Sequence, residues 1–453
     1  MARELLTREF IENLKEAIGT KDDELVKKLI KDLHAADLAE LHYGLSTEEA
    51  KYVFPLLDQD TAADVLLELE VDEREEFLEI LPGDVIARFV GNMNSDDAAD
   101  IIGELPDERI EEVLQNIEDV EQAGEIVDLL SYDEDTAGGL MAKELIKVNE
   151  EWDIETCVRE IRKEAIDVDD VYNVYVVDDN DILKGTVSLK RVMIARPNAK
   201  IKNMYKPDLL FVRTDTSSAE VARIMEKYDV VALPVVDPIG RLEGRITIDD
   251  VVDVIMEEAE RDYQLISGIT EDVAPSDSIM VQTRARLPWL LIGLIGGIVA
   301  AQIIGNFEDE LRFDPMLALF VPLIAAMGGN VGVQSSSIVV QGLANKSLGF
   351  DSTWKKLLKE LSVAFIIAVT FSSLILAYNL LVSNTLELTL TVSSALFSVI
   401  LFASVFGTFI PLILNRFKID PAVATGPFIT TTNDILGLFI YFGLGRLLYG
   451  ILS

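Results

Sequence analysis

The pattern of apolar and polar residues divides the chain into two halves. The last third contains long apolar stretches, which lie at 287–307, 316–344, 361–383, 391–414 and 422–450. Each stretch reaches or exceeds the ~20 residues that an α-helix needs to cross a bilayer. The residues before them alternate between apolar and charged positions over short distances. The pattern predicts a multidomain membrane protein in which soluble domains precede a five-span α-helical transmembrane domain at 287–453.

The first part of the soluble half, residues 1–132, contains short amphipathic segments at helical spacing. Segment 62–65 (AADV) recurs as segment 98–101 (AADI), and further matches follow at the same offset of 36 residues. A helical unit repeated at this length is typical of stacked helical hairpins. We therefore predict an all-α N-terminal superhelical domain, on which most acidic side chains form a solvated face.

A second repeat follows at an offset of 59 residues. Segments 175–178 (YVVD) and 183–187 (LKGTV) correspond to segments 234–237 (PVVD) and 242–247 (LEGRIT). Each copy predicts a strand, a polar turn, a second strand and a helix, with another helix before the strands. This α/β unit resembles a tandem pair of cystathionine-β-synthase (CBS) modules, which we place at 133–198 and 199–262.

The resemblance to CBS modules implies a nucleotide-binding hypothesis. The second copy carries Thr247 and Asp250 in the Thr-x-x-Asp pattern that contacts a ribose in many CBS pairs. The first copy has Ser188 and Arg191 at these positions and lacks the acid. ATP or another adenine nucleotide at the CBS pair is one alternative, and a sensor of ions alone is the other.

Acidic residues crowd at the end of the second module, between 249 and 262. On a helix, Asp250, Asp253 and Glu257 share one face, where like charges repel. A cation beside this face would relieve the repulsion. After a turn-rich break at Gly268, we predict a connecting (plug) helix within 263–286 that transmits movements of the soluble domains to the first span.

The charge of the chain is as uneven as its hydropathy. The 453 residues include 78 acids and 39 bases, for a formal net charge of −39. From Thr283 onward there are 9 acids and 10 bases, so the first 282 residues hold 69 acids and 29 bases. This excess of acids argues against nucleic acid as a partner, because nucleic-acid binding depends on Lys and Arg. The natural counterion of the soluble half is a cation.

The loops between the predicted spans alternate in charge. Basic residues precede the first span and follow the second and fourth spans, whereas acids follow the first and third. Positive loops remain on the cytoplasmic side. We predict a multi-pass protein of the cell (plasma) membrane, with cytoplasmic N-terminal domains and an extracellular or periplasmic C-terminus at Ser453. Arg446 is an exception that snorkels to the interface.

The fifth stretch contains one carboxylate near its middle, Asp434. A charge at this depth costs ~2.5–3.5 kcal/mol on insertion scales and normally faces a bundle interior or a water-filled path. Thr430, Thr431, Thr432 and Asn433 add oxygen atoms, which suit hard cations. An ion path is the first hypothesis, and a proton relay or a buried interhelical hydrogen bond is the alternative. Two copies related by a two-fold axis would bring two fifth spans together.

The second stretch contains Gly328, Gly329, Asn330 and Gly332 within five residues. Glycines weaken a helix and allow close backbone approach. Two interpretations follow. In one, Asn330 and exposed carbonyl groups line a hydrated path; in the other, the glycines serve only close helix packing.

The order of these parts resembles the MgtE family of magnesium channels over essentially the whole chain. The most specific segments are 285–289 (ARLPW), 328–334 (GGNVGVQ), 420–422 (DPA) and 433–437 (NDILG). The resemblance implies a homodimer whose pore is lined by the second and fifth spans, with Asp434 coordinating hydrated Mg²⁺. It makes Asn330, Gly328, Gly329 and Thr430 candidate pore residues. Asn433 stands where the family has Ser.

The resemblance also implies sites on the soluble side that sense intracellular Mg²⁺. The acids at the corresponding positions are Asp64, Asp96, Asp100, Asp229, Asp250, Asp253, Glu258 and Asp420. Near Ser217 and Ala219 the chain lacks acids that the family has, so we expect fewer or weaker sites there.

Together these features predict a Mg²⁺-selective channel or transporter that mediates magnesium uptake and is gated by intracellular Mg²⁺. The alternative is a proton- or ion-coupled secondary transporter of divalent cations. The soluble half shows no nucleophile–base pair, P-loop or metal-binding His cluster, so we do not expect an enzyme.

Overall fold

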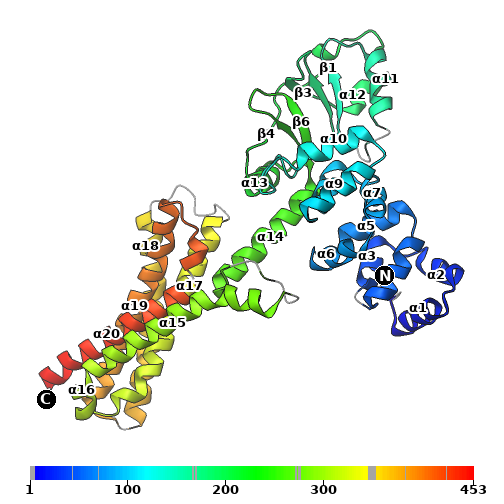
Figure 1. The fold of residues 1–453 in the computed structure, drawn as a ribbon. Helices are drawn as coiled ribbons and strands as arrows, with labels where there is room; N and C mark the ends of the chain where they lie inside the picture. Colours follow the sequence, from blue (N-terminus) through cyan, green and yellow to red (C-terminus); the bar gives the residue numbers. More distant parts are fainter. Residues whose placement is uncertain are drawn as a thin grey trace. The chain divides into compact units, whose positions relative to one another are not determined.

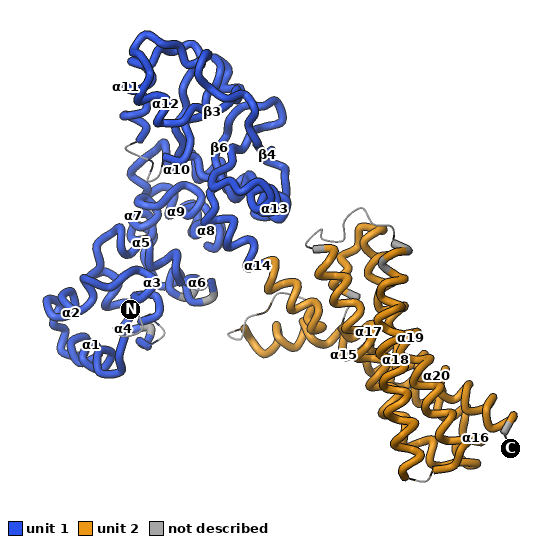
Figure 2. Tube along the Cα trace, turned by 180° about the vertical axis from the view of Figure 1, so that it is seen from behind, with its two compact units in different colours: residues 1–257 blue, residues 258–453 orange. Residues whose placement is uncertain are grey.

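The computed structural model describes residues 6–42, 44–69, 71–165, 168, 171–270, 273, 277–344, 353–382, 384–424 and 426–452. Ser453, whose side of the membrane was predicted above, lies outside them. The chain forms two compact units, residues 1–257 and residues 258–453 (Figure 2).

The N-terminal part of the first unit is helical, as predicted (Figure 1). Its elements are α1 (Arg8–Thr20), α2 (Asp23–Ile30), α3 (Ala35–His42), α4 (Thr47–Val53), the 3₁₀ turn η2 (Phe54–Leu56), α5 (Gln59–Glu68), α6 (Val71–Ile80), α7 (Gly83–Val90), α8 (Ser95–Gly103), α9 (Asp107–Asn116) and α10 (Val120–Leu129). Helix α5 packs on α3, α7 on α5, α9 on α7, and α10 on α8. This stacking of alternate helices is the arrangement expected for repeated hairpins.

The two predicted α/β modules follow. The first contains β1 (Ile146–Asn149), α11 (Ile154–Glu164), β2 (Val174–Val177), β3 (Leu183–Val187), α12 (Leu189–Ile194) and the 3₁₀ turn η3 (Ile201–Asn203). The second contains β4 (Val212–Arg213), α13 (Ser218–Tyr228), β5 (Ala232–Val236), β6 (Leu242–Thr247) and the start of α14 (Ile248–Ser267). Each sheet has one parallel pair followed by one antiparallel pair, in the orders β1-β2-β3 and β4-β5-β6.

The two modules are equivalent in detail. Their antiparallel pairs shift register between Val176 and Val177 and between Val235 and Val236, again 59 residues apart. In the second module, a Cβ on Gly244 would lie 2.7 Å from the Ala142 carbonyl oxygen. In the first, a Cβ on Gly185 would overlap the Lys206 carbonyl. A glycine at each site therefore lets another backbone segment lie directly on the strand.

The connection to the membrane half differs from the prediction in one respect. The acidic helix after β6 runs as α14 to Ser267, because the sequence offers no helix breaker before Gly268, where φ is +82°. After a loop, α15 (Ile279–Asn306) is continuous, so the end of the predicted connecting helix and the first span form one helix.

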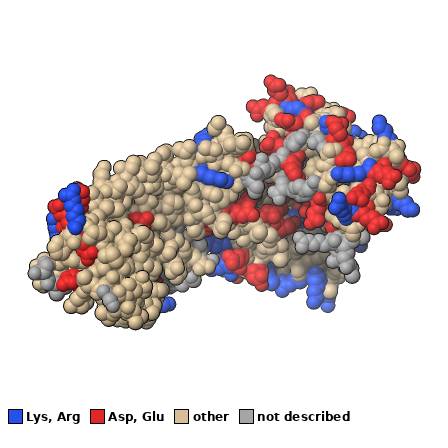
Figure 3. Space-filling model, turned by 90° about the horizontal axis from the view of Figure 1, so that it is seen from below, with Lys and Arg blue, Asp and Glu red and all other residues tan. Residues whose placement is uncertain are grey.

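Among the described residues, five helices are long and apolar enough to cross a membrane, as predicted. They are α15, α17 (Leu317–Ala344), α18 (Thr353–Leu381), α19 (Leu386–Arg416) and α20 (Gly426–Leu452), with the short α16 (Glu308–Phe313) after α15 and the 3₁₀ turn η4 (Pro421–Ala424) before α20. Helix α19 packs against α17, α18 and α20, and α20 also contacts α15 and α17. In the view of Figure 3 the bundle is largely free of charged side chains, whereas acids cover much of the first unit.

Candidate ion-binding sites

Three of the predicted pore residues meet where α17 crosses α20. Gly329 is buried in this contact, and Thr430 and Asp434 face it from α20. A Cβ on Gly329 would lie 3.1 Å from Thr430 Cγ2 and 3.4 Å from Asp434 Oδ1. Asp434 is half-buried, and Asn330 is exposed in the single chain. The crossing therefore places a carboxylate oxygen and the Thr430 methyl group beside a side-chain-free stretch of backbone. The Thr430 hydroxyl donates to the Gly426 carbonyl of its own helix (3.1 Å).

The glycines of α17 also serve helix packing. Gly328 is buried, and a Cβ there would lie 3.1 Å from Val399 Cγ1 of α19. Side chains at Gly332 or Gly407 would overlap α20 or the backbone of α17. The helix is continuous through these positions, so the Gly-rich stretch does not interrupt its hydrogen bonding. Close helix packing is therefore enough to explain a glycine at position 332. Gly329 differs, because it also adjoins Asp434, the candidate ion ligand.

Asn433, the position that departs from the family pattern, points away from solvent. The residue is 1% exposed and lies against Gly332. Neither Nδ2 nor Oδ1 of its amide has a hydrogen-bond partner within the described residues. Asn433 therefore sits at the helix contact rather than beside Asp434 in a common ligand set.

A second carboxylate lies within the bundle and was missed by the sequence analysis. Glu360 of α18 accepts hydrogen bonds from Ser335 of α17 (2.7 Å) and Ser404 of α19 (3.1 Å), and these two hydroxyl groups are themselves 3.0 Å apart. Both serines are buried. The available signal was an acid directly before the apolar stretch at 361–383, but its position beside Lys359 suggested a loop.

In the first unit, several predicted sensing acids are brought together between α8 and the start of α14. Burial, reinforced by Asp97 and then Asp250, raises the pKa of Asp96 well above its usual range. Burial, followed by the charges of Asp250 and Asp249, raises the pKa of Asp97 to about 7, and Asp64 adds to this effect. We call Asp64, Asp96, Asp97, Asp100, Asp249, Asp250 and Asp253 the acidic junction.

Hydrogen bonds fix the two sides of the acidic junction. Glu144 accepts from the backbone N–H of Ser95 (2.9 Å) and from its hydroxyl (2.8 Å), which holds the start of α8. On the other side, Asp250 accepts from the Thr247 backbone N–H (3.1 Å) and hydroxyl (2.7 Å). The predicted nucleotide-contacting pair is thus adjacent, and Asp250 belongs to both candidate sites. The sequence analysis missed Asp97 and Glu144.

Burial is also the main reason why the pKa values of Asp100 and Asp250 are raised. Burial and then the charge of Asp97 raise the pKa of Asp100 to about 7. Burial is also the largest cause of the raised pKa of Asp250, to which Asp249 and Asp253 contribute. Carboxylates that repel one another in a partly desolvated place have an excess of negative charge that a divalent cation neutralises.

A smaller acidic group lies in the second unit, beside the start of α20. Burial, followed by the charges of Asp420 and Glu258, raises the pKa of Asp262. Asp420 and Glu258 were predicted sensing residues, and Asp262 joins them. The last predicted acid, Asp229, is exposed at the end of α13 and is not part of either group.

Within the parts of the chain that the structure describes, no three His, Cys, Asp or Glu side chains converge closely enough to hold an ion by themselves. Mg²⁺ often contacts carboxylates through water, because it gives up its water shell reluctantly.

The chain is similar to known families and proteins over most of its length. Family models match the chain as a divalent cation transporter at residues 321–444, as the MgtE intracellular N domain at 33–135 and as CBS domains at 137–198 and 201–257. The magnesium transporter MgtE of Thermus thermophilus is 34% identical over 440 residues, 96% of this chain and 98% of its own length. The magnesium transporter MgtE of Bacillus subtilis is 30% identical over 423 residues, 92% of each chain.

Among solved structures, the cytosolic domain of the Mg²⁺ channel MgtE in complex with ATP is 35% identical. It covers 54% of this chain and 99% of its own length, with a TM-score of 0.51. The two relatives extend over the soluble domains and the spans alike. The chain belongs to the MgtE family of divalent cation transporters.

Proposed function

We propose that the chain is a Mg²⁺-selective channel that mediates magnesium uptake and closes when intracellular Mg²⁺ is high. The observation that carries this proposal is the crossing of α17 and α20, where Asp434 Oδ1 adjoins Gly329 and Thr430. The names of the relatives, magnesium transporters and a Mg²⁺ channel, support Mg²⁺ as the ion.

In this proposal the active form is a homodimer in which two copies of α20 face a central path. Two Asp434 carboxylates attract a doubly charged ion, while Thr430 and Asn330 contact its water shell. Such a site selects by charge density and leaves most of the water in place, so the ion is not held too tightly to leave. Gly329 leaves room for the hydrated ion beside Asp434, and Gly328 lets α17 approach α19 closely so that this crossing can form.

The acidic junction acts as the sensor. Without Mg²⁺ its carboxylates repel one another, which favours separation of α8 from α14. Mg²⁺ bound between them stabilises the closed arrangement, and the difference in its affinity for the two arrangements shifts the population. We place Asp229 with the sensing acids only as an outlying site.

Helix α14 carries the signal to the pore. Its last turn contacts the start of α20, because a Cβ on Gly268 would lie 2.6 Å from Pro427 Cγ. The Thr270 backbone N–H (3.0 Å) and hydroxyl (2.9 Å) also donate to the Ala285 carbonyl of α15. Mg²⁺ held by Asp262, Glu258 and Asp420 would fix this joint in the closed state.

An adenine nucleotide is a second regulator in the proposal. Its ribose would be held by Thr247 and Asp250, and the ATP complex of the similar cytosolic domain supports this assignment. Since Asp250 also belongs to the acidic junction, nucleotide and Mg²⁺ would influence each other. The soluble domains face the cytoplasm of the cell in this arrangement.

Mg²⁺ flux into liposomes tests the proposal. We expect Asp434→Ala to reduce flux to the level of empty liposomes, whereas Glu387→Gln, at the start of α19, retains it. Removal of residues 1–262 should leave flux that internal Mg²⁺ no longer suppresses. Normal flux in Asp434→Ala would refute the pore assignment. Flux that requires a pH gradient would instead favour the coupled transporter.

A further inference from the structure

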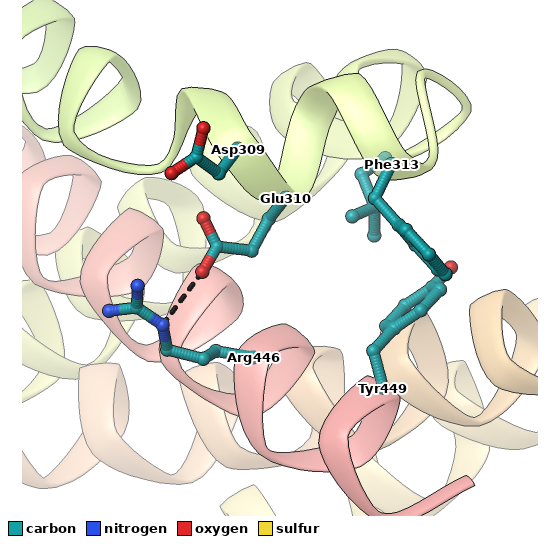
Figure 4. Close-up of a pocket in the computed structure, with 6 residues that line it drawn as sticks. Asp309, Glu310, Phe313, Arg446 and Tyr449 are labelled. Carbon is teal, nitrogen blue, oxygen red and sulfur yellow. Dashed lines mark ion pairs between the residues drawn. The ribbon is translucent and has the colours of Figure 1, made fainter. Parts of the chain in front are cut away.

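A pocket lies between α16 and the end of α20, and its lining shares no residue with the α17–α20 crossing. Its volume is about 210 Å³, and its lining is Asp309, Glu310, Phe313, Leu317, Arg446 and Tyr449. Figure 4 shows the charged side chains at one end, with Arg446 reaching Glu310, and the rings of Phe313 and Tyr449 at the other. One water molecule takes up ~30 Å³, so the pocket holds a group of several non-hydrogen atoms.

The charged end combines both signs. Arg446 Nε lies 2.7 Å from Glu310 Oε1, and the Arg446 side chain is 67% exposed. The second oxygen of Glu310, Oε2, is buried and has no hydrogen-bond partner within the described ranges. Asp309, next to it, is exposed. The pocket therefore offers acceptors for an N–H donor beside a guanidinium that suits a phosphate group.

The other end is aromatic and apolar. The rings of Phe313 and Tyr449 are 5.7 Å apart and nearly perpendicular, and Tyr449 donates to Asp314 Oδ2 (2.5 Å). Leu317 is buried, whereas Phe313 is 69% exposed. This end lies where two spanning helices end, a level at which aromatic side chains meet the headgroup region of a bilayer. A fully hydrated divalent cation would gain little from such a surface and would be repelled by Arg446.

We propose that this pocket binds the headgroup of a phospholipid with a primary ammonium group, such as phosphatidylethanolamine. The ammonium group donates to Glu310 Oε2 and Asp309, the phosphate lies against Arg446, and the methylene groups contact Phe313 and Tyr449. A trimethylammonium headgroup cannot donate a hydrogen bond to Glu310. The site therefore distinguishes the ethanolamine headgroup from the choline headgroup.

Native mass spectrometry of the purified full chain tests this. Phosphatidylethanolamine and phosphatidylcholine with the same acyl chains are added in equal amounts, and the ratio of their bound forms is measured. We expect a preference for phosphatidylethanolamine that falls about tenfold in Glu310→Gln and in Asp309→Asn, as for the loss of a charge-assisted hydrogen bond. Glu308→Gln is the matched control, because Glu308 lies on the same helix and pairs with Arg312 outside the pocket.

Asp309 is exposed, so its variant tests binding even where Glu310→Gln impairs folding. Equal binding of the two lipids, or a preference unchanged in Asp309→Asn, would overturn the proposal. Displacement of the lipid by millimolar MgCl₂ would show a cation site instead, and displacement by soluble phosphoethanolamine would show that no lipid is needed. Because lipid binding rather than flux is measured, a negative result leaves the channel proposal intact.

Discussion

Asp434 and Gly329 adjoin each other across the contact of α20 with α17: a Cβ on Gly329 would lie 3.4 Å from Asp434 Oδ1. Gly329→Ala therefore changes the environment of the carboxylate directly. We expect Mg²⁺ flux to fall severalfold. Stability should change little, since a gain in helix propensity of about 1 kcal/mol opposes an overpacking cost of about 1–3 kcal/mol.

Liposome flux and thermal unfolding in detergent measure the two effects. Gly293→Ala in α15 is the control, because a Cβ at that position would meet no described residue within 4 Å apart from its own stretch of helix. It should retain flux. If Gly329→Ala also retained it, this side of α17 would not border the ion path.

The buried amide of Asn433 leads to a prediction about the stability of the protein. Its two polar atoms are unpartnered in the described structure, and burying such a group without hydrogen bonds costs about 1–3 kcal/mol. Asn433→Ser removes most of the amide, including the Nδ2 that lies against Gly332. We expect a melting temperature equal to or above that of the unaltered chain, with flux retained. A clear loss of stability would mean that the amide is hydrogen-bonded in the membrane-embedded protein.

The sequence predicted the elements better than their contacts. The strands and helices of the CBS modules follow from a repeat whose two copies support each other, and the spans follow from apolar length alone. The faces of the spans did not follow, because uniformly apolar helices carry no periodic signal. Thus the burial of Asn433 and the partners of Glu360 depend on neighbouring helices that are distant in the sequence. Asp97 was passed over because its partner Asp250 lies 153 residues away.

Glu360 should contribute to the stability of the bundle. It is the common acceptor of Ser335 and Ser404, so Glu360→Ala removes the hydrogen bonds that join α18 to α17 and α19. Interhelical hydrogen bonds in membranes contribute about 1–2 kcal/mol in model peptides. We expect a loss of this size by thermal unfolding in detergent. Lys359→Ala, at the exposed neighbouring position, is the control and should have no such effect. Equal stability of both variants would show that the serines find other partners.

The raised pKa values at the acidic junction lead to a prediction about stability. The stability without Mg²⁺ and the stabilisation by Mg²⁺ should change in opposite directions with pH. The pKa values of Asp97 and Asp100, about 7, lie above the ordinary carboxyl value, so the folded state binds protons more tightly than the unfolded state. Without Mg²⁺, the free energy of unfolding of fragment 1–267 should fall as the pH rises from about 4 to about 7.

Mg²⁺ binds the ionised carboxylates, so the stabilisation it provides should grow over the same pH range and be largest above pH 7. Thermal unfolding of the fragment at pH 5 and pH 8, with and without Mg²⁺, measures both trends. In Asp97→Asn both should weaken, whereas Asp84→Asn, at an exposed position of α7, should leave them unchanged. Stabilisation by Mg²⁺ that was the same at the two pH values would place the ion elsewhere, because only sites with ordinary carboxyl pKa values are fully ionised at both.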